Sequence, residues 1–132
     1  MTAIRFGYAI LFVPSVQDAL TFYERAFGFQ DSFLHPAGDY GELKTGDTKI
    51  AFTSHTLATQ AVPFTYQPIE SAQPTFGVEF TLVTPDVDAA FTRATQAGAE
   101  PLAQPHDTSW GQRVAYVRDC HGLGIGIATP MD

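Results

Sequence analysis

The chain contains one pattern twice, and this repeat restricts its possible folds more than any other feature. In the first copy, the extended apolar run Tyr8–Val13 ends at Pro14, and in the second copy Glu79–Thr84 ends in the same way at Pro85. A strand often ends at proline because proline has no amide proton to donate to its sheet. We therefore expect two equivalent modules, each beginning with a strand.

A predicted helix follows each of these strands. Ser15 and Asp86 lie where an N-cap residue would accept the free amide protons of the first helical turn. Apolar residues then recur at three- and four-residue intervals, which predicts helices over Val16–Phe27 and Val87–Ala97. A glycine follows each helix and provides its C-terminal stop.

Three short strand candidates follow each helix, so the order βαβββ occurs twice. Glycine and aspartate occupy the turns between them, where both tolerate unusual backbone angles. The expected strands are 29–34, 40–45 and 49–54 in the first copy, and 101–104, 112–118 and 124–129 in the second.

The two copies are joined by a long segment rich in Pro, Gln, Thr and Ser, which we interpret as a surface linker. A loop this long in a small domain is usually functional or mobile. Phe64 and Tyr66 within it either close over a cleft or pin the loop to the body, and the sequence leaves both open. We predict a single domain over 1–132, with module one at about 4–54, the linker at 55–74 and module two at about 75–130.

Composition limits the class of protein. Hydrophobic residues make up 45% and charged residues 16%, as expected of a chain with a packed core. The net charge of −7 and the absence of a basic stretch disfavour nucleic acid and anionic membranes, and the charge favours cationic ligands. No apolar run reaches membrane length, and the lone Cys120 fits a reducing compartment, so we expect a cytoplasmic protein.

Two motifs resemble those of the glyoxalase/bleomycin-resistance/extradiol dioxygenase superfamily, the vicinal oxygen chelate proteins. Pro14 with the Phe-Tyr-Glu and Phe-Gly-Phe of 22–29 is similar to its strand–helix signature. Residues 110–113 and 119–122 resemble its closing hairpin, with Cys-His where the family usually has Pro-Asp. The resemblance covers nearly the whole chain. It implies an α+β fold of two tandem βαβββ modules, whose curved mixed sheets face a cleft that two subunits often share.

Metal enzymes of the superfamily take one ligand from the first and one from the last strand of each module. These positions fall on Tyr8, Ala51, Glu79 and Gly126, counted from the prolines and from the flanking apolar pairs. A divalent ion needs several converging donors, whereas alanine and glycine have none and a phenol is a poor ligand unless ionised. The four histidines lie in turns or at strand ends without ligand spacing. We therefore expect no metal, no cofactor and no catalytic residue.

Space freed at the vacated positions predicts an apolar ligand cleft. It would be lined by Tyr8, Ile10 and Phe12 on one side and by Glu79, Thr81 and Val83 on the other. Glu79 is either an anchor for a cationic or hydrogen-bond-donating ligand, or a carboxylate satisfied by Tyr8 or Thr81.

The nearest comparison within the family is the metal-free bleomycin resistance protein, whose aromatic stacking positions fall on Trp110 and Tyr40. Two rings beside a slot can stack a planar aromatic ligand. The alternative for Trp110 is a hairpin residue that packs against its sheet.

The expected function is sequestration of a planar aromatic antibiotic or metabolite by a homodimer. The alternatives are a glyoxalase-like lyase, an isomerase or a dioxygenase, with Glu79 and Tyr8 as acid and base, or a protein with an empty cleft. The candidate ligand-binding residues are Tyr8, Ile10, Phe12, Tyr40, Ala51, Glu79, Thr81, Trp110 and Gly126.

Overall fold

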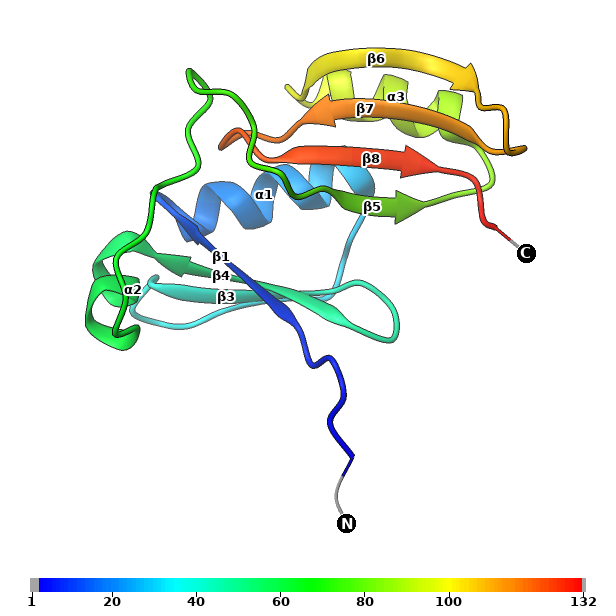
Figure 1. Cartoon of the computed structure of the whole chain (residues 1–132). Helices are drawn as coiled ribbons and strands as arrows, with labels where there is room; N and C mark the ends of the chain where they lie inside the picture. Colours follow the sequence, from blue (N-terminus) through cyan, green and yellow to red (C-terminus); the bar gives the residue numbers. More distant parts are fainter. Residues whose placement is uncertain (1–2, 132) are drawn as a thin grey trace.

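The computed structural model describes residues 3–131 and arranges the repeat as two βαβββ modules (Figure 1). The first module consists of β1 (Ala9–Val13), α1 (Val16–Phe27), β2 (Ser32–Leu34), β3 (Tyr40–Lys44) and β4 (Lys49–Ser54). The linker begins with a short helix, α2 (His55–Ala61). The second module consists of β5 (Phe80–Val83), α3 (Val87–Gln96), β6 (Glu100–Asp107), β7 (Arg113–Arg118) and β8 (Gly124–Ala128).

Each module forms one mixed four-stranded sheet, and the two sheets have the same strand order. The orders are β1-β4-β3-β2 and β5-β8-β7-β6, with the first strand of each module parallel to the last. Ile10 is paired with Ala51 in the first sheet, and Thr81 with Gly126 in the second. This confirms the predicted α+β fold of two tandem modules.

Side-chain caps begin the two long helices, as predicted. The Ser15 hydroxyl accepts the Asp18 amide proton over 3.1 Å, and the Asp86 carboxylate accepts that of Ala89 over 3.1 Å. Helix α1 ends at Gly28, whose φ of +79° belongs to the left-handed region that glycine adopts without strain.

The core lies between the helices and one face of each sheet, and Figure 1 shows α1 between the two sheets. Helix α1 covers β3 and β4, helix α3 covers β6 and β7, and the two helices pack against each other. The apolar residues that flank Ala51 and Gly126 belong to this core; they are Ile50 and Phe52 on β4, and Ile125 and Ile127 on β8. Because they face the helices, the strand register predicted from the sequence is confirmed. The other face of each sheet carries no helix of its own module.

A polar contact also joins the modules. The Arg93 side chain, from α3, donates to the carbonyl of Arg25 over 2.9 Å and to that of Glu24 over 3.5 Å. The last carbonyls of a helix have no partner within the helix and carry a partial negative charge. Arg93 therefore caps α1 from the other module, and a side chain at Gly28 would collide with its guanidinium.

Three elements differ from the sequence-based expectation by more than one residue at an end. Helix α2 occupies the start of the predicted linker, with Ser54 as its N-cap. Strand β2 begins at Ser32 rather than at 29, because Phe29 packs against the core after the α1 cap. Strand β6 extends to Asp107, although it contains two prolines, because it is an edge strand whose register shifts at 101–106.

Within residues 3–131, no helix combines the length and the apolar character needed to cross a bilayer.

Candidate functional site

The candidate residues separate into two groups, because the helix-free faces belong to different sheets. Tyr8, Ile10, Phe12, Tyr40 and Ala51 lie in or beside the first sheet, whereas Glu79, Thr81, Trp110 and Gly126 lie in or beside the second. A groove between the modules is lined by 79–83 together with Ala9 and Lys49. Successive strand residues point to opposite faces, so Tyr8 and Ile10 lie on the other face of β1 from Ala9. Within one chain, the side of the expected cleft that contains Tyr8 and Ile10 therefore does not face the side that contains Glu79.

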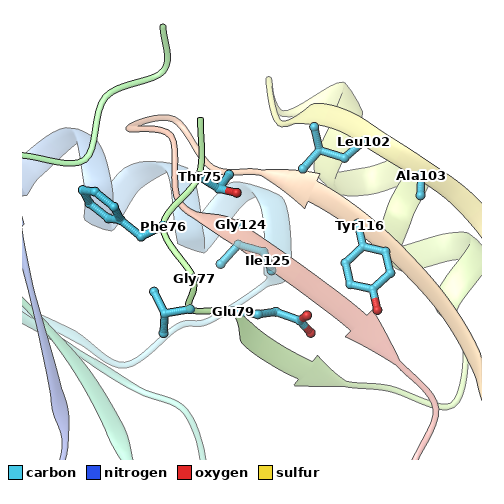
Figure 2. A pocket seen from close by; sticks show the side chains of 10 residues that line it. Thr75, Phe76, Gly77, Glu79, Leu102, Ala103, Tyr116, Gly124 and Ile125 are labelled. Carbon is cyan, nitrogen blue, oxygen red and sulfur yellow. The ribbon is translucent and has the colours of Figure 1, made fainter. Parts of the chain in front are cut away.

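The second sheet carries two adjoining hollows. One has a volume of about 410 Å³ and is lined by Thr81, Val83, Trp110 and Gly126, together with Glu79 and Tyr116. The other, of about 560 Å³, shares Glu79 and Tyr116 and adds residues between the linker and β5, such as Phe76. Figure 2 shows the Glu79 carboxylate and the Tyr116 ring in this second hollow, with Phe76 across from them. Glu79 is therefore the charged group at the border of both hollows.

Glu79 is held by its immediate neighbours rather than by a cation. Its Oε2 accepts a hydrogen bond of 2.5 Å from the Thr81 hydroxyl, which is one of the two arrangements expected from the sequence. No Lys, Arg or His among the described residues forms an ion pair with it. A Cβ at Gly126 would overlap Oε2, so the carboxylate fills the space that the vacated position was expected to leave open. An anionic oxygen thus lies at the centre of this face.

Trp110 stands at the edge of the first hollow with 65% of its surface exposed. Its indole N–H donates to Gln112 Oε1 over 2.7 Å, and Gln112 in turn donates to the carbonyl of Thr129 over 2.7 Å. These bonds hold the ring in place without covering it. The indole ring therefore lies largely exposed beside the hollow.

The first sheet carries a cluster that the sequence analysis missed. Glu42 Oε2 accepts hydrogen bonds from the Tyr40 hydroxyl over 2.6 Å and from Lys49 Nζ over 2.9 Å. The Lys49 ammonium also lies 4.6 Å from the centroid of the Tyr8 ring. Hydrogen bonds from Tyr40 and Lys49 lower the pKa of Glu42, whereas burial and the bond to Glu42 raise the pKa of Tyr40. The alternation of β3 and β4, which puts Glu42 beside Ala51, was the sequence signal that could have revealed it.

The other candidates on this sheet are more covered. Ala51 is completely buried, and the ring of Phe12 packs against Tyr66 with a centroid distance of 4.8 Å. Tyr66 stacks on His55, and its hydroxyl lies 2.6 Å from His55 Nδ1. Of the two roles considered for the linker aromatics, Tyr66 therefore fills the pinning role, while Phe64 remains exposed.

Arg118 attaches the far end of the linker to the second module. Its guanidinium donates to the carbonyls of Glu70, Ser71 and Gln73, while its Nε donates to the carbonyl of Gly122 over 2.9 Å. The residues that follow the linker, 75–78, line the larger hollow. This arginine thus positions one wall of the site.

The donor set of a family-type metal centre is not assembled by residues 3–131. No group of three or more His, Cys, Asp or Glu side chains in that range is close enough together to hold an ion. Of the four expected ligand positions, Ala51 and Gly126 offer no donor, Tyr8 contacts Lys49, and Glu79 stands on a different sheet from both Tyr8 and Ala51. Tyr8 and Glu79 are likewise not brought together as an acid–base pair. These residues do not fit the metal of the superfamily's enzymes.

Solved structures with the same fold are numerous. A glyoxalase-related enzyme from Fulvimarina pelagi superposes with a TM-score of 0.81 at 16% identity, covering 96% of this chain and 88% of the other. A glyoxalase/bleomycin resistance protein/dioxygenase family enzyme from Burkholderia phytofirmans PsJN gives 0.74 at 24% identity, over 95% and 98%. TioX from Micromonospora sp. ML1 gives 0.73 at 23% identity, over 96% and 99%. These similarities show the fold alone.

No curated protein matches the sequence. The family is nevertheless decided by a sequence model that matches residues 5–127, nearly the whole chain. Both module motifs lie inside this range. The chain belongs to the Glyoxalase/Bleomycin resistance protein/Dioxygenase superfamily.

Proposed function

We propose that this protein is a metal-free binding protein that sequesters a planar aromatic cation on the helix-free face of its second sheet. The observation that carries the proposal is Glu79, an unpaired carboxylate in the same hollow as the exposed indole of Trp110. A cationic ring system would stack on the indole and place its charge near the carboxylate. Antibiotics and metabolites with such ring systems are the expected ligands, and the net charge of −7 favours their approach.

The surroundings of Glu79 support a ligand anchor rather than a structural ion pair. The carboxylate uses one oxygen for the short bond to Thr81, and Oε1 has no hydrogen bond to the described residues. Apolar side chains, including Val83 and Leu102, line the hollows around it. A mainly apolar surface with few polar anchors is the usual makeup of a small-molecule site.

The active form in this proposal is a homodimer. The helix-free faces expose Tyr8, Ile10 and Val83, and the arm before β1 exposes Phe6 at 74% and Ile4 completely. Large apolar side chains exposed in this way are typical of an interface in a soluble protein. Pairing the first sheet of one copy with the second sheet of another would cover both faces and give Glu79 and Trp110 an opposite wall. Light scattering should give about twice the mass of 14.3 kDa, and Ile10→Glu should lower it.

Fluorescence titration tests the proposal directly, because Trp110 is the only tryptophan. Proflavine, a planar aromatic cation, should quench Trp110 and saturate, whereas an anionic aromatic such as pyrene sulfonate should bind at least about ten-fold more weakly. Glu79→Gln should weaken proflavine binding by about ten-fold, since Glu79 is the only charged side chain among the described residues that line the two hollows. Calorimetry on Trp110→Phe, which lacks the indole, should show the same loss without relying on the fluorescence signal.

Equal affinity of Glu79→Gln and the unmodified protein for proflavine would contradict the proposed anchor. Metal analysis is a second test, made on protein purified without chelators. We expect much less than one equivalent of metal, and a full equivalent of Ni, Zn, Fe or Mn would overturn the binding-protein proposal in favour of an enzyme of the superfamily.

A further inference from the structure

We propose that Tyr8, Tyr40 and Glu42 form a second binding site, specific for an organic ammonium ion, which the protein fills with a lysine of its own. The site lies on the helix-free face of the first sheet, in a different module from Glu79 and Trp110. In the homodimer proposed above, this face is the opposite wall of the cleft that contains Glu79, so its place in that cleft rests on the proposed function, whereas the contacts of Lys49 lie within one chain. Lys49 shows both where a cation sits and which groups receive it.

Glu42 and Tyr8 contact the Lys49 ammonium, and Tyr40 holds the carboxylate of Glu42. Glu42 Oε2 accepts one of its protons over 2.9 Å, and the face of the Tyr8 ring lies 4.6 Å from the nitrogen. Tyr40 donates to the same oxygen over 2.6 Å, so it orients the carboxylate. A carboxylate beside aromatic rings is how proteins bind alkylated ammonium groups.

Lys49 is held weakly enough to be displaced. Its side chain is 35% exposed and makes one hydrogen bond within the described part of the chain. Partly exposed ion pairs contribute little net stability, because both charges are well solvated when they separate. The lysine stem is flexible, so the ammonium can move into solvent while the cage remains.

The carboxylate stays ready for a cation after Lys49 leaves. The strongest of the contacts that lower the Glu42 pKa is the hydrogen bond from Tyr40, which does not depend on the lysine. Glu42 therefore remains ionised near neutral pH. Its neighbour across the strands is Ala51, which is paired in turn with Ile10, so an apolar floor lies next to the charge. The fitting ligand is amphipathic, with an ammonium head and an apolar body.

Lys49→Gln provides the test, since it removes the internal occupant. The probe is benzyltrimethylammonium chloride, titrated at constant ionic strength and followed by NMR of ring-labelled tyrosines, assigned with Tyr8→Phe and Tyr40→Phe. Lys44→Gln is the matched control: Lys44 is the cross-strand neighbour of Lys49, is exposed, and loses the same charge without emptying the cage. The Tyr8 and Tyr40 signals should shift saturably, with affinity at least three-fold higher in Lys49→Gln than in Lys44→Gln.

Glu42→Gln should abolish the saturable shifts of Tyr8 and Tyr40. If that variant does not fold, Glu42→Asp replaces it and should bind the probe more weakly, because its carboxylate is withdrawn by one methylene. Absence of saturable shifts in Lys49→Gln, or equal gains in both lysine variants, would overturn the proposal. Quenching of Trp110 by proflavine tests the proposed function, whereas the tyrosine shifts and their dependence on Lys49 and Glu42 test this site, so the two failures are separate outcomes.

Discussion

The hydroxyl of Tyr23 donates a buried hydrogen bond of 2.6 Å to Asp119 Oδ2, and so joins the first module's helix to the second module's closing turn. The other carboxylate oxygen, Oδ1, accepts the amide protons of 121, 122 and 123, each over 2.9 Å. One aspartate thus shapes the β7–β8 turn and attaches it to α1. Both residues belong to the motifs by which the sequence resembles its family.

Tyr23→Phe should destabilise the protein by about 1–3 kcal/mol, because it leaves a buried carboxylate oxygen without a donor. Urea unfolding measures the change. Tyr116→Phe is the control, since the Tyr116 hydroxyl makes no hydrogen bond within residues 3–131 and its ring is only partly buried. A loss of stability no larger than that of the control would show that the bond between the modules contributes nothing net.

The same bond predicts instability at alkaline pH. Burial, and then the charge and hydrogen bond of Asp119, raise the pKa of Tyr23 well above its usual value near 10. The neutral phenol is the form that folding favours, so this stability is present below pH 10 and is lost as the pH rises above it. The urea midpoint should therefore fall more steeply above pH 10 in the unmodified protein than in Tyr23→Phe. Parallel pH profiles would exclude this explanation.

Alanine substitutions at Gly122 and Gly126 should differ in their effects on stability and on ligand affinity. Gly122→Ala places a Cβ against the backbone of Glu70 at a φ of +106°, where neither side can yield, and should cost about 1–3 kcal/mol. Gly126→Ala meets side-chain ends alone, the Glu79 carboxylate and the Thr81 hydroxyl, so its cost in stability should stay below about 1 kcal/mol. It should nevertheless displace the carboxylate and alter proflavine affinity. Gly126→Ala with unchanged affinity would mean that the Glu79 position does not matter for the ligand.

Arg118→Ala should release the end of the linker, because three of its carbonyls lose their common donor. Hydrogen exchange should accelerate in peptides covering 68–78, with little change in α1. Arg25→Ala is the matched control, since this exposed helix residue loses the same charge and its side chain makes none of the hydrogen bonds to the linker. Equal exchange in the two variants would show that the linker is held by other contacts.

Cys120 should react slowly with thiol reagents, although it lies at the surface. Desolvation, and then the carboxylates of Asp119 and Asp18, raise the pKa of its thiol to about 12. At pH 8 the reactive thiolate is therefore scarce, and alkylation by iodoacetamide should be at least about ten-fold slower than for a cysteine peptide. The rate should rise to the peptide's value in urea. A fast reaction in the native state would show that the thiol is not desolvated.

The elements that the sequence predicted best are those whose signals are local and strong. Helix α1 has a full apolar stripe, an N-cap serine and a C-terminal glycine, and its predicted bounds are those observed. Helix α2 has seven residues, of which only Ala58 is buried, so no periodic pattern marked it. The prolines of β6 resembled a strand end, but at a sheet edge they are tolerated.

The site was predictable only in part, because its arrangement depends on contacts between modules. Alternation and the repeat placed Glu79 beside Gly126, and the Thr81 bond to Glu79 was one of the expected alternatives. The separation of Tyr8 and Tyr40 from Trp110 follows from the packing of α1 on α3, which involves residues far apart in the sequence. The contact between Glu42 and Lys49 was not predicted, because it depends on the register with which β3 pairs with β4.

The cap that Arg93 provides for α1 has a consequence for synthesis on the ribosome. When the first 54 residues have emerged, α1 has its apolar face and its own N-cap, but the Arg93 guanidinium that donates to the Arg25 carbonyl is not yet made. The carboxylate that receives Tyr23 comes later still, at position 119. The first half of the nascent chain therefore lacks two native hydrogen-bond partners of α1, Arg93 and Asp119, until the second module has been synthesised.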